Sequence, residues 1–135
     1  AKAVAAQIEQ TEAELQASGT ADAQAVARRL AAARQAFLDA VDFMAANTKA
    51  NPNAAFAGSV PYLMLAGNLV AGWQMGRALL VAQQLSSKGQ DQAFMQAKIA
   101  TARFYAEHIL VKAPAQRDAI VEGAASVTAL ALDAF

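Results

Sequence analysis

Cysteine is absent from the 135-residue sequence, and histidine occurs once. Without cysteine the chain forms no disulfide, offers no thiolate nucleophile and cannot build a cysteine-based zinc site. A single histidine leaves few good ligands for a transition metal. We therefore expect no metal site in these residues.

Net charge is also absent, because 11 lysines and arginines balance 11 aspartates and glutamates. A neutral chain has no overall field to attract nucleic acid or an anionic membrane surface. The densest cationic group, Arg28, Arg29 and Arg34, is scattered rather than continuous and is interpreted as a solvated helix face. We expect no nucleic-acid partner.

Glycine and proline are scarce, with seven and three residues, whereas 38 of the 135 residues are alanine. Runs of β-branched residues are missing as well. Because alanine has the highest helix propensity, helix is the favoured state of such a chain. The composition predicts an all-α fold and, at this length, one domain over residues 1–135.

Apolar periodicity predicts five helical segments separated by breaks. They cover approximately residues 1–17, 21–48, 60–86, 90–111 and 114–131. The connections are mostly short, which is typical of antiparallel neighbours, so we expect an up-and-down antiparallel bundle of four to five helices.

The breaks carry recognisable helix signals. Thr20 is a candidate N-cap, and Asp22 complements the positive end of the helix that follows it. Pro52 stops a helix, Gly89 suits the left-handed position after a helix, and Pro114 suits a first helical turn.

Within the segment 60–86, residues 60–82 nearly qualify as a bilayer-spanning helix, which needs about 20 mostly apolar residues. The segment contains Asn68, Gln74 and Arg77, and arginine at a helix centre costs about 2.5 kcal/mol or more on insertion. Its polar residues do not share one face, so no broad side is left for solvent. We therefore expect no membrane span but the buried central helix of a bundle.

Three residues of this helix are predicted to pack closely. Gly72 and Gly76, spaced four apart, together with Gly67 and Ala71, would let a neighbouring backbone approach. Trp73 is expected in the core or at an interface. We predict Gly72, Gly76 and Trp73 as helix-packing residues.

Asn68 and Arg77 are predicted to be buried polar residues of the same helix. Arg77 could hold an anionic ligand, but a buried charge must be paired in any case. The interpretation that we favour is an ion pair within the chain. Its candidate partners are Asp39, Asp42, Glu107 and Glu122.

Residues 90–111 carry a second face beside their core stripe. Phe94, Tyr105 and His108 line up at helical spacing, and we predict them as a docking ridge for another domain. The alternative is ordinary packing. A role of His108 as a general base is disfavoured, because the serines of the chain sit in no nucleophile motif.

Motifs that carry chemistry are missing from the sequence. It has no glycine-rich phosphate loop, no HExxH, no paired-carboxylate motif and no ExxH di-metal signature. Glu9, Glu12 and Glu14 are interpreted as a solvated face. We predict no catalytic, cofactor-binding or metal-binding residue in this chain.

Three stretches, VPYLMLAGNLVAGWQMGRALL, AKIATARFYAEHIL and VEGAASVTALALDAF, resemble a known family. They are similar to the small helical domain at the C-terminus of a subgroup of bacterial acyl-CoA dehydrogenases. That subgroup includes 3-methylmercaptopropionyl-CoA dehydrogenases. The resemblance is best over residues 56–135, whereas residues 1–50 fit as two helices of the right length.

The resemblance implies a fragment from the C-terminus of a longer, cytoplasmic and homo-oligomeric flavoenzyme. Such enzymes use FAD to remove two hydrogens from the α and β carbons of an acyl-CoA thioester, and a glutamate of an earlier domain takes the α-proton. Those catalytic residues have no counterpart in this sequence. We expect a non-catalytic domain without a cofactor that packs on the catalytic body or at a subunit interface. A free-standing helical protein-interaction module is the alternative.

Overall fold

The computed structural model describes residues 1–134, and every regular element within this range is helical. This confirms the all-α prediction. The elements are α1 (Lys2–Ala17), α2 (Ala21–Ala50), α3 (Pro52–Ala57), α4 (Ser59–Ser87), α5 (Gln92–His108), η1 (Leu110–Lys112), α6 (Ala113–Val121), α7 (Ala124–Val127) and η2 (Leu132–Ala134).

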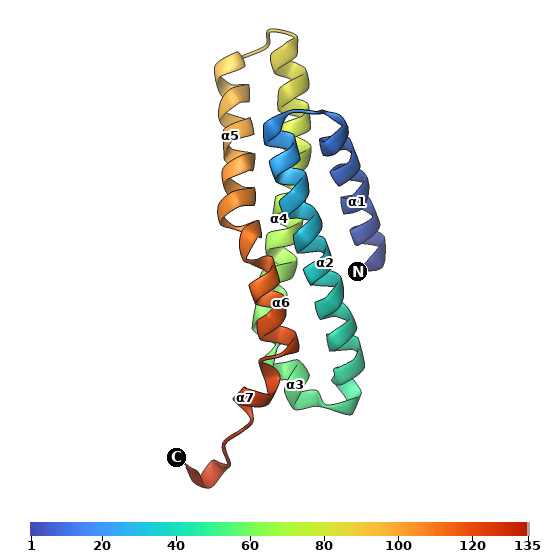
Figure 1. Ribbon diagram of the computed structural model, residues 1–135, viewed down its shortest axis with the longest axis vertical. Coiled ribbons are helices and arrows are strands. Elements are labelled where there is room, and N and C mark those ends of the chain that lie inside the picture. Colours follow the sequence, from blue (N-terminus) through green and yellow to red (C-terminus); the bar gives the residue numbers. More distant parts are fainter. Residues whose placement is uncertain (135) are drawn as a thin grey trace.

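The long helices form an up-and-down antiparallel bundle, as the short connections predict (Figure 1). α4 runs along the whole length of the bundle, whereas α2 begins short of the end where α4 connects to α5 (Figure 1). α1 packs on one side of them, while α5 and then α6 pack on the other, one after the other along the bundle. The C-terminal residues extend beyond the end where α3 and α7 lie (Figure 1).

The predicted helix signals at two of the connections are confirmed. Thr20 caps α2, because its Oγ1 accepts a hydrogen bond of 3.2 Å from the backbone N–H of Ala23. Gly89 adopts a φ of +74° after α4, which glycine tolerates without strain. The backbone N–H of Gln90 then reaches the carbonyl of Leu85 at 3.1 Å and closes a Schellman motif.

The chain between α2 and α4 is helical rather than irregular. Pro52 ends α2, as predicted, but it also begins the short helix α3. The side chain of Asn51 accepts a hydrogen bond from the backbone N–H of Ala54 and caps α3. The connection between α2 and α4 therefore contains one short helix that the sequence did not predict.

The expected helix over 114–131 is wrong beyond Val121. The helix α6 ends there, and the chain continues through Gly123 into the single turn of α7. Glycine has a low helix propensity, and the exposed Val127 and Leu130 find no core to pack against. Helix α5 also ends earlier than expected, since a 3₁₀ turn carries Leu110 into the core.

The core lies between α2 and α4 and takes large side chains from almost every long helix. α2 adds many buried alanines, which let its neighbours approach closely. The largest fully buried residues are Ile8, Leu15, Val26, Leu30, Leu65, Leu69, Leu79, Leu110 and Ile120.

Helix α4 is central, but it is not surrounded on all sides. It buries one stripe, formed by Leu65, Leu69, Gly72, Gly76, Leu79 and Ala82. Its opposite side is exposed, so the expectation that no side faces solvent is wrong. Apolar periodicity shows that a helix face avoids water but does not show what covers it. Over the described residues, none of the helices combines the length and apolar character that a bilayer span needs.

Candidate docking surface

The exposed side of α4 carries several large apolar side chains. Leu63 and Leu65 illustrate the contrast between the two sides, because Leu63 is 70% exposed and Leu65 is fully buried. We call this surface the α4 face. Its large apolar residues are Val60, Leu63, Met64, Val70 and Val81, with the exposed Phe56 of α3 next to it.

The opposite surface of the bundle has a different character. The outward side of α2 exposes polar and charged residues, among them Arg28, Arg29, Gln35 and Asp42. Helix α4, by contrast, contains a single charged residue, Arg77. Large exposed apolar patches on a folded domain mark interaction sites. The bundle therefore has a polar surface suited to water and an apolar surface suited to a partner.

A groove of about 460 Å³ lies beside the α4 face, between α4 and α5. We call it the α4–α5 groove. It is lined by Gln74, Arg77, Ala78, Val81, Ala82 and Leu85 of α4 and by Phe94, Met95 and Lys98 of α5.

Both charged residues of this groove are cations that lie over aromatic rings. The guanidinium carbon of Arg77 is 5.6 Å from the centre of the Trp73 ring, and the Lys98 ammonium is 5.1 Å from that of Phe94. Such cation–π contacts stabilise a cation without neutralising it. The groove thus combines apolar walls with positive charge.

The prediction that Arg77 is buried is wrong. Its side chain is exposed and donates a hydrogen bond of 3.1 Å to Oε1 of Gln74 on the same helix. Among the residues that the structure describes, it forms no ion pair with any of the four predicted acids. Asn68 is half-buried, and its backbone carbonyl accepts a hydrogen bond of 3.3 Å from the hydroxyl of Tyr105.

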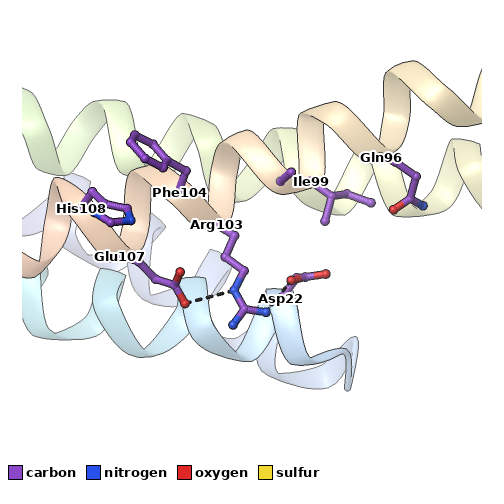
Figure 2. Close-up of a pocket in the computed structure, with 8 residues that line it drawn as sticks. Asp22, Gln96, Ile99, Arg103, Phe104, Glu107 and His108 are labelled. Atoms are coloured by element: carbon purple, nitrogen blue, oxygen red, sulfur yellow. Dashed lines mark hydrogen bonds and ion pairs between the residues drawn. The ribbon is translucent and has the colours of Figure 1, made fainter.

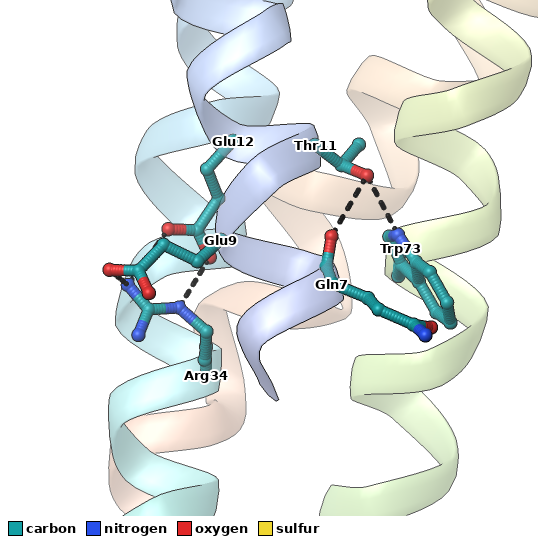
Figure 3. A network of polar contacts seen from close by, with 6 residues as sticks. All are labelled: Gln7, Glu9, Thr11, Glu12, Arg34 and Trp73. Carbon is teal, nitrogen blue, oxygen red and sulfur yellow. Dashed lines mark hydrogen bonds and ion pairs between the residues drawn. The ribbon is translucent and has the colours of Figure 1, made fainter. Parts of the chain in front are cut away.

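The three residues predicted for helix packing lie at contacts between α4 and its neighbours. A Cβ at Gly72 would be 2.6 Å from Cδ1 of Leu110, and one at Gly76 would be 3.1 Å from Cδ1 of Leu15. The indole Nε1 of Trp73 donates a hydrogen bond of 2.8 Å to Thr11 of α1 (Figure 3). Gly67 has no such contact: it is exposed on the α4 face.

A bidentate ion pair between Glu12 and Arg34 joins α1 to α2 (Figure 3). The two hydrogen bonds measure 2.9 and 3.0 Å, and Glu9 lies 3.4 Å from the same guanidinium. Glu12 is only 5% exposed, so its interpretation as part of a solvated face is wrong. The hydrogen bond to Glu12 raises the pKa of Arg34.

The sequence held a signal for this pair. Glu12 lies four residues after Ile8, and Arg34 lies four residues after Leu30, so each occupies the apolar stripe of its helix. Opposite charges on the apolar stripes of two adjacent helices are expected to pair, because an unpaired buried charge is costly.

The predicted ridge of Phe94, Tyr105 and His108 is divided among three environments. Phe94 borders the α4–α5 groove with Lys98, whereas Tyr105 is half-buried against α4. His108 stacks on the exposed Phe104, with ring centres 4.4 Å apart (Figure 2). Phe104 is absent from the predicted ridge, although its position four residues before His108 makes it a helical neighbour of that residue.

On the side of α5 that faces away from the α4–α5 groove, an arginine links α5 to α2 through an ion pair. Arg103 bridges the carboxylates of Asp22 and Glu107 at 2.8 and 3.0 Å (Figure 2). These hydrogen bonds, first to Asp22 and then to Glu107, raise the pKa of Arg103. Its charge is therefore satisfied within the bundle, in contrast to the cations of the α4–α5 groove.

In the part of the chain that the structure describes, no three histidine or carboxylate side chains gather where they could hold a metal ion. The most distinctive surface feature is the apolar α4 face with its cationic groove. This arrangement can bind an apolar surface that carries negative charge at one edge.

The chain is similar to a described protein family and to a bacterial enzyme. Residues 4–131 match a family described as "Acetyl-CoA dehydrogenase C-terminal like". The sequence is 47% identical over 122 residues to the 3-methylmercaptopropionyl-CoA dehydrogenase of Ruegeria pomeroyi. That alignment covers 90% of this chain and 21% of the relative, so the chain spans about a fifth of the relative's length.

Proposed function

Because the chain belongs to the acyl-CoA dehydrogenase C-terminal-like family, we propose that it is a non-catalytic accessory domain of an FAD-dependent acyl-CoA dehydrogenase. Residues 1–135 would form one domain at the C-terminus of the longer enzyme. The parent enzyme would oxidise an acyl-CoA thioester at its α and β carbons, with FAD supplied by other domains. We place this enzyme in the cytoplasm, as a homo-oligomer.

The observation that carries the proposal is the α4 face, taken together with the match to one fifth of a longer enzyme. A domain that worked alone would expose Val60, Leu63 and Val70 to water without benefit. A domain that packs on a larger protein would bury them and stabilise both parts. The proposed role is therefore to support the catalytic body of the parent chain, either directly or at a subunit contact.

A free-standing interaction module is the alternative function, and the α4 face is compatible with it. The relative's greater length favours the accessory domain, since the matched region of that protein lies within a longer chain. The reading frame that encodes this chain distinguishes the two. A long frame with further domains supports the accessory domain, whereas a short frame supports the module.

The proposal is tested by purifying the complete protein encoded by that reading frame, beside residues 1–135 alone. The complete protein is expected to carry FAD and to reduce an electron acceptor when it is given a suitable acyl-CoA. Residues 1–135 alone are expected to bind neither FAD nor acyl-CoA and to show no dehydrogenase activity. Stoichiometric flavin on residues 1–135, or a complete protein without flavin, would overturn the proposal.

A further inference from the structure

We propose that the α4–α5 groove and the adjoining α4 face dock onto the catalytic part of the same polypeptide, at an apolar surface bordered by a carboxylate. This inference rests on the proposed function and specifies which surface of the bundle makes the contact and what chemistry the partner surface has. Three features of the groove support it.

The first feature is charge. Arg77 and Lys98 are the only charged residues that line the groove, and both are cations. Within residues 1–134 neither forms an ion pair. Complementary charge across an interface fixes its register and disfavours wrong partners. The partner surface is thus expected to place an aspartate or glutamate opposite Arg77 and Lys98.

The second feature is the shape of the site. The groove is open to solvent and adjoins the α4 face at Val81, which belongs to both. A small-molecule site usually encloses most of its ligand, and an open groove does not. A surface that extends from Phe56 at one end of α4 to Val81 and Phe94 at the other suits a protein partner instead.

The third feature argues against a second copy of this domain. In a two-fold symmetric pair the same patch faces itself. Helix α4 contains no acidic residue, and neither does the lining of the groove. The lining of the groove in a second copy would therefore bring no carboxylate to Lys98 or Arg77, and Glu14, which shares a separate pocket with Arg77, belongs to α1 and not to this lining. The catalytic part of the longer chain is the partner that the observations favour, because the chain spans only 21% of its relative.

The test uses the complete protein and a zero-length cross-linker that joins lysine amines to carboxylates. The expected result is an amide bond between Lys98 and an aspartate or glutamate outside residues 1–135, found by mass spectrometry. Mixing isotope-labelled and unlabelled protein distinguishes a link within one chain from a link between two. A Lys98 link to residues 1–135 of a second copy, or no link of Lys98 to any carboxylate, would overturn the inference.

Charge reversal provides the second measurement. Arg77→Glu is expected to lower the yield of the Lys98 link about tenfold, because it places a negative charge against the partner's carboxylate. The matched control is Arg28→Glu, an exposed arginine on the polar side of α2, which should leave the yield unchanged. Reversing the linked carboxylate to lysine should restore docking to the Arg77→Glu variant, measured as protection of the domain junction from protease. An equal effect of both arginine variants would overturn the inference.

The two proposals fail in different ways. A complete protein that carries FAD and is active, but shows no Lys98 link, would leave the proposed function standing and refute the docking site. A complete protein that lacks flavin but gives the Lys98 link within one chain would refute the proposed function and keep the docking site.

Discussion

Leu110 packs directly on the backbone of Gly72, so that a Cβ at position 72 would lie within 2.6 to 2.9 Å of three Leu110 side-chain atoms. Leu110 is fully buried and cannot move aside without disturbing the core. This contact joins α4 to the 3₁₀ turn after α5. It makes Gly72 the most constrained of the three glycines within α4.

Alanine substitutions at these three glycines are therefore expected to change the free energy of unfolding in different directions. Gly67→Ala should stabilise the domain by up to about 1 kcal/mol, because alanine favours helix and position 67 has free space. Gly76→Ala should be nearly neutral, since the nearest atom, Cδ1 of Leu15, lies 3.1 Å away. Gly72→Ala should destabilise it by about 1–3 kcal/mol through overpacking. Urea unfolding of residues 1–135 measures the series, and any other order contradicts these contacts.

The ion pair between Glu12 and Arg34 is expected to contribute to stability, because Glu12 is buried and accepts two hydrogen bonds. Arg34→Gln should cost about 1–3 kcal/mol by leaving a buried carboxylate without its partner. Glu12→Gln should cost less, since the guanidinium of Arg34 keeps some contact with water and with Glu9. Thermal unfolding measures both.

A double-mutant cycle separates the interaction energy between Glu12 and Arg34 from the contacts that each residue makes with the rest of the domain. The double variant should cost less than the two single variants together, with a coupling of about 0.5–3 kcal/mol. Arg29→Gln, at an exposed position of the same helix, should change stability by less than about 0.5 kcal/mol. Additive single effects would show that the two residues act independently.

Apolar periodicity and composition were sufficient to predict the bundle and most helix ends. The high helix propensity of alanine favours the helices, and the short connections between them favour antiparallel neighbours. Periodicity was insufficient at Arg77, which lies on the exposed side of a helix whose average character is apolar. At Glu12 the apolar stripe of α1 does indicate burial, and only the charge of the residue suggests a solvated face. Burial depends on which neighbouring helix covers a face, and a single sequence does not contain that information. The exposed apolar α4 face illustrates the same limit, since its proposed partner lies outside the bundle.

Tyr105 is expected to make the free energy of unfolding depend on pH in the alkaline range. Burial raises the pKa of its hydroxyl above the ordinary value of 10.0. Above about pH 10 the unfolded chain therefore releases this proton more readily than the folded chain, and the free energy of unfolding falls as pH rises. This contribution is fully present below the unfolded pKa.

Tyr105→Phe isolates this effect. At neutral pH the variant should lose about 0.5–1.5 kcal/mol, because the hydrogen bond to the carbonyl of Asn68 is removed. Between about pH 9 and pH 11 its stability should decline less steeply than that of the wild type. Urea unfolding across this range gives both slopes. Parallel curves would mean that the hydroxyl of Tyr105 titrates alike in the folded and unfolded chains.

Two leucines on opposite sides of α4 provide the sharpest test of which side is covered within the domain. Leu65→Ala removes a fully buried side chain and should cost about 2–5 kcal/mol through lost burial and a cavity. Leu63→Ala removes a side chain that is 70% exposed and should change stability by less than about 0.5 kcal/mol. Unfolding of residues 1–135 measures both variants. In the complete protein, where the α4 face is proposed to be covered, Leu63→Ala should become destabilising as well. A large cost of Leu63→Ala in residues 1–135 alone would show that this side of α4 is already buried without a partner.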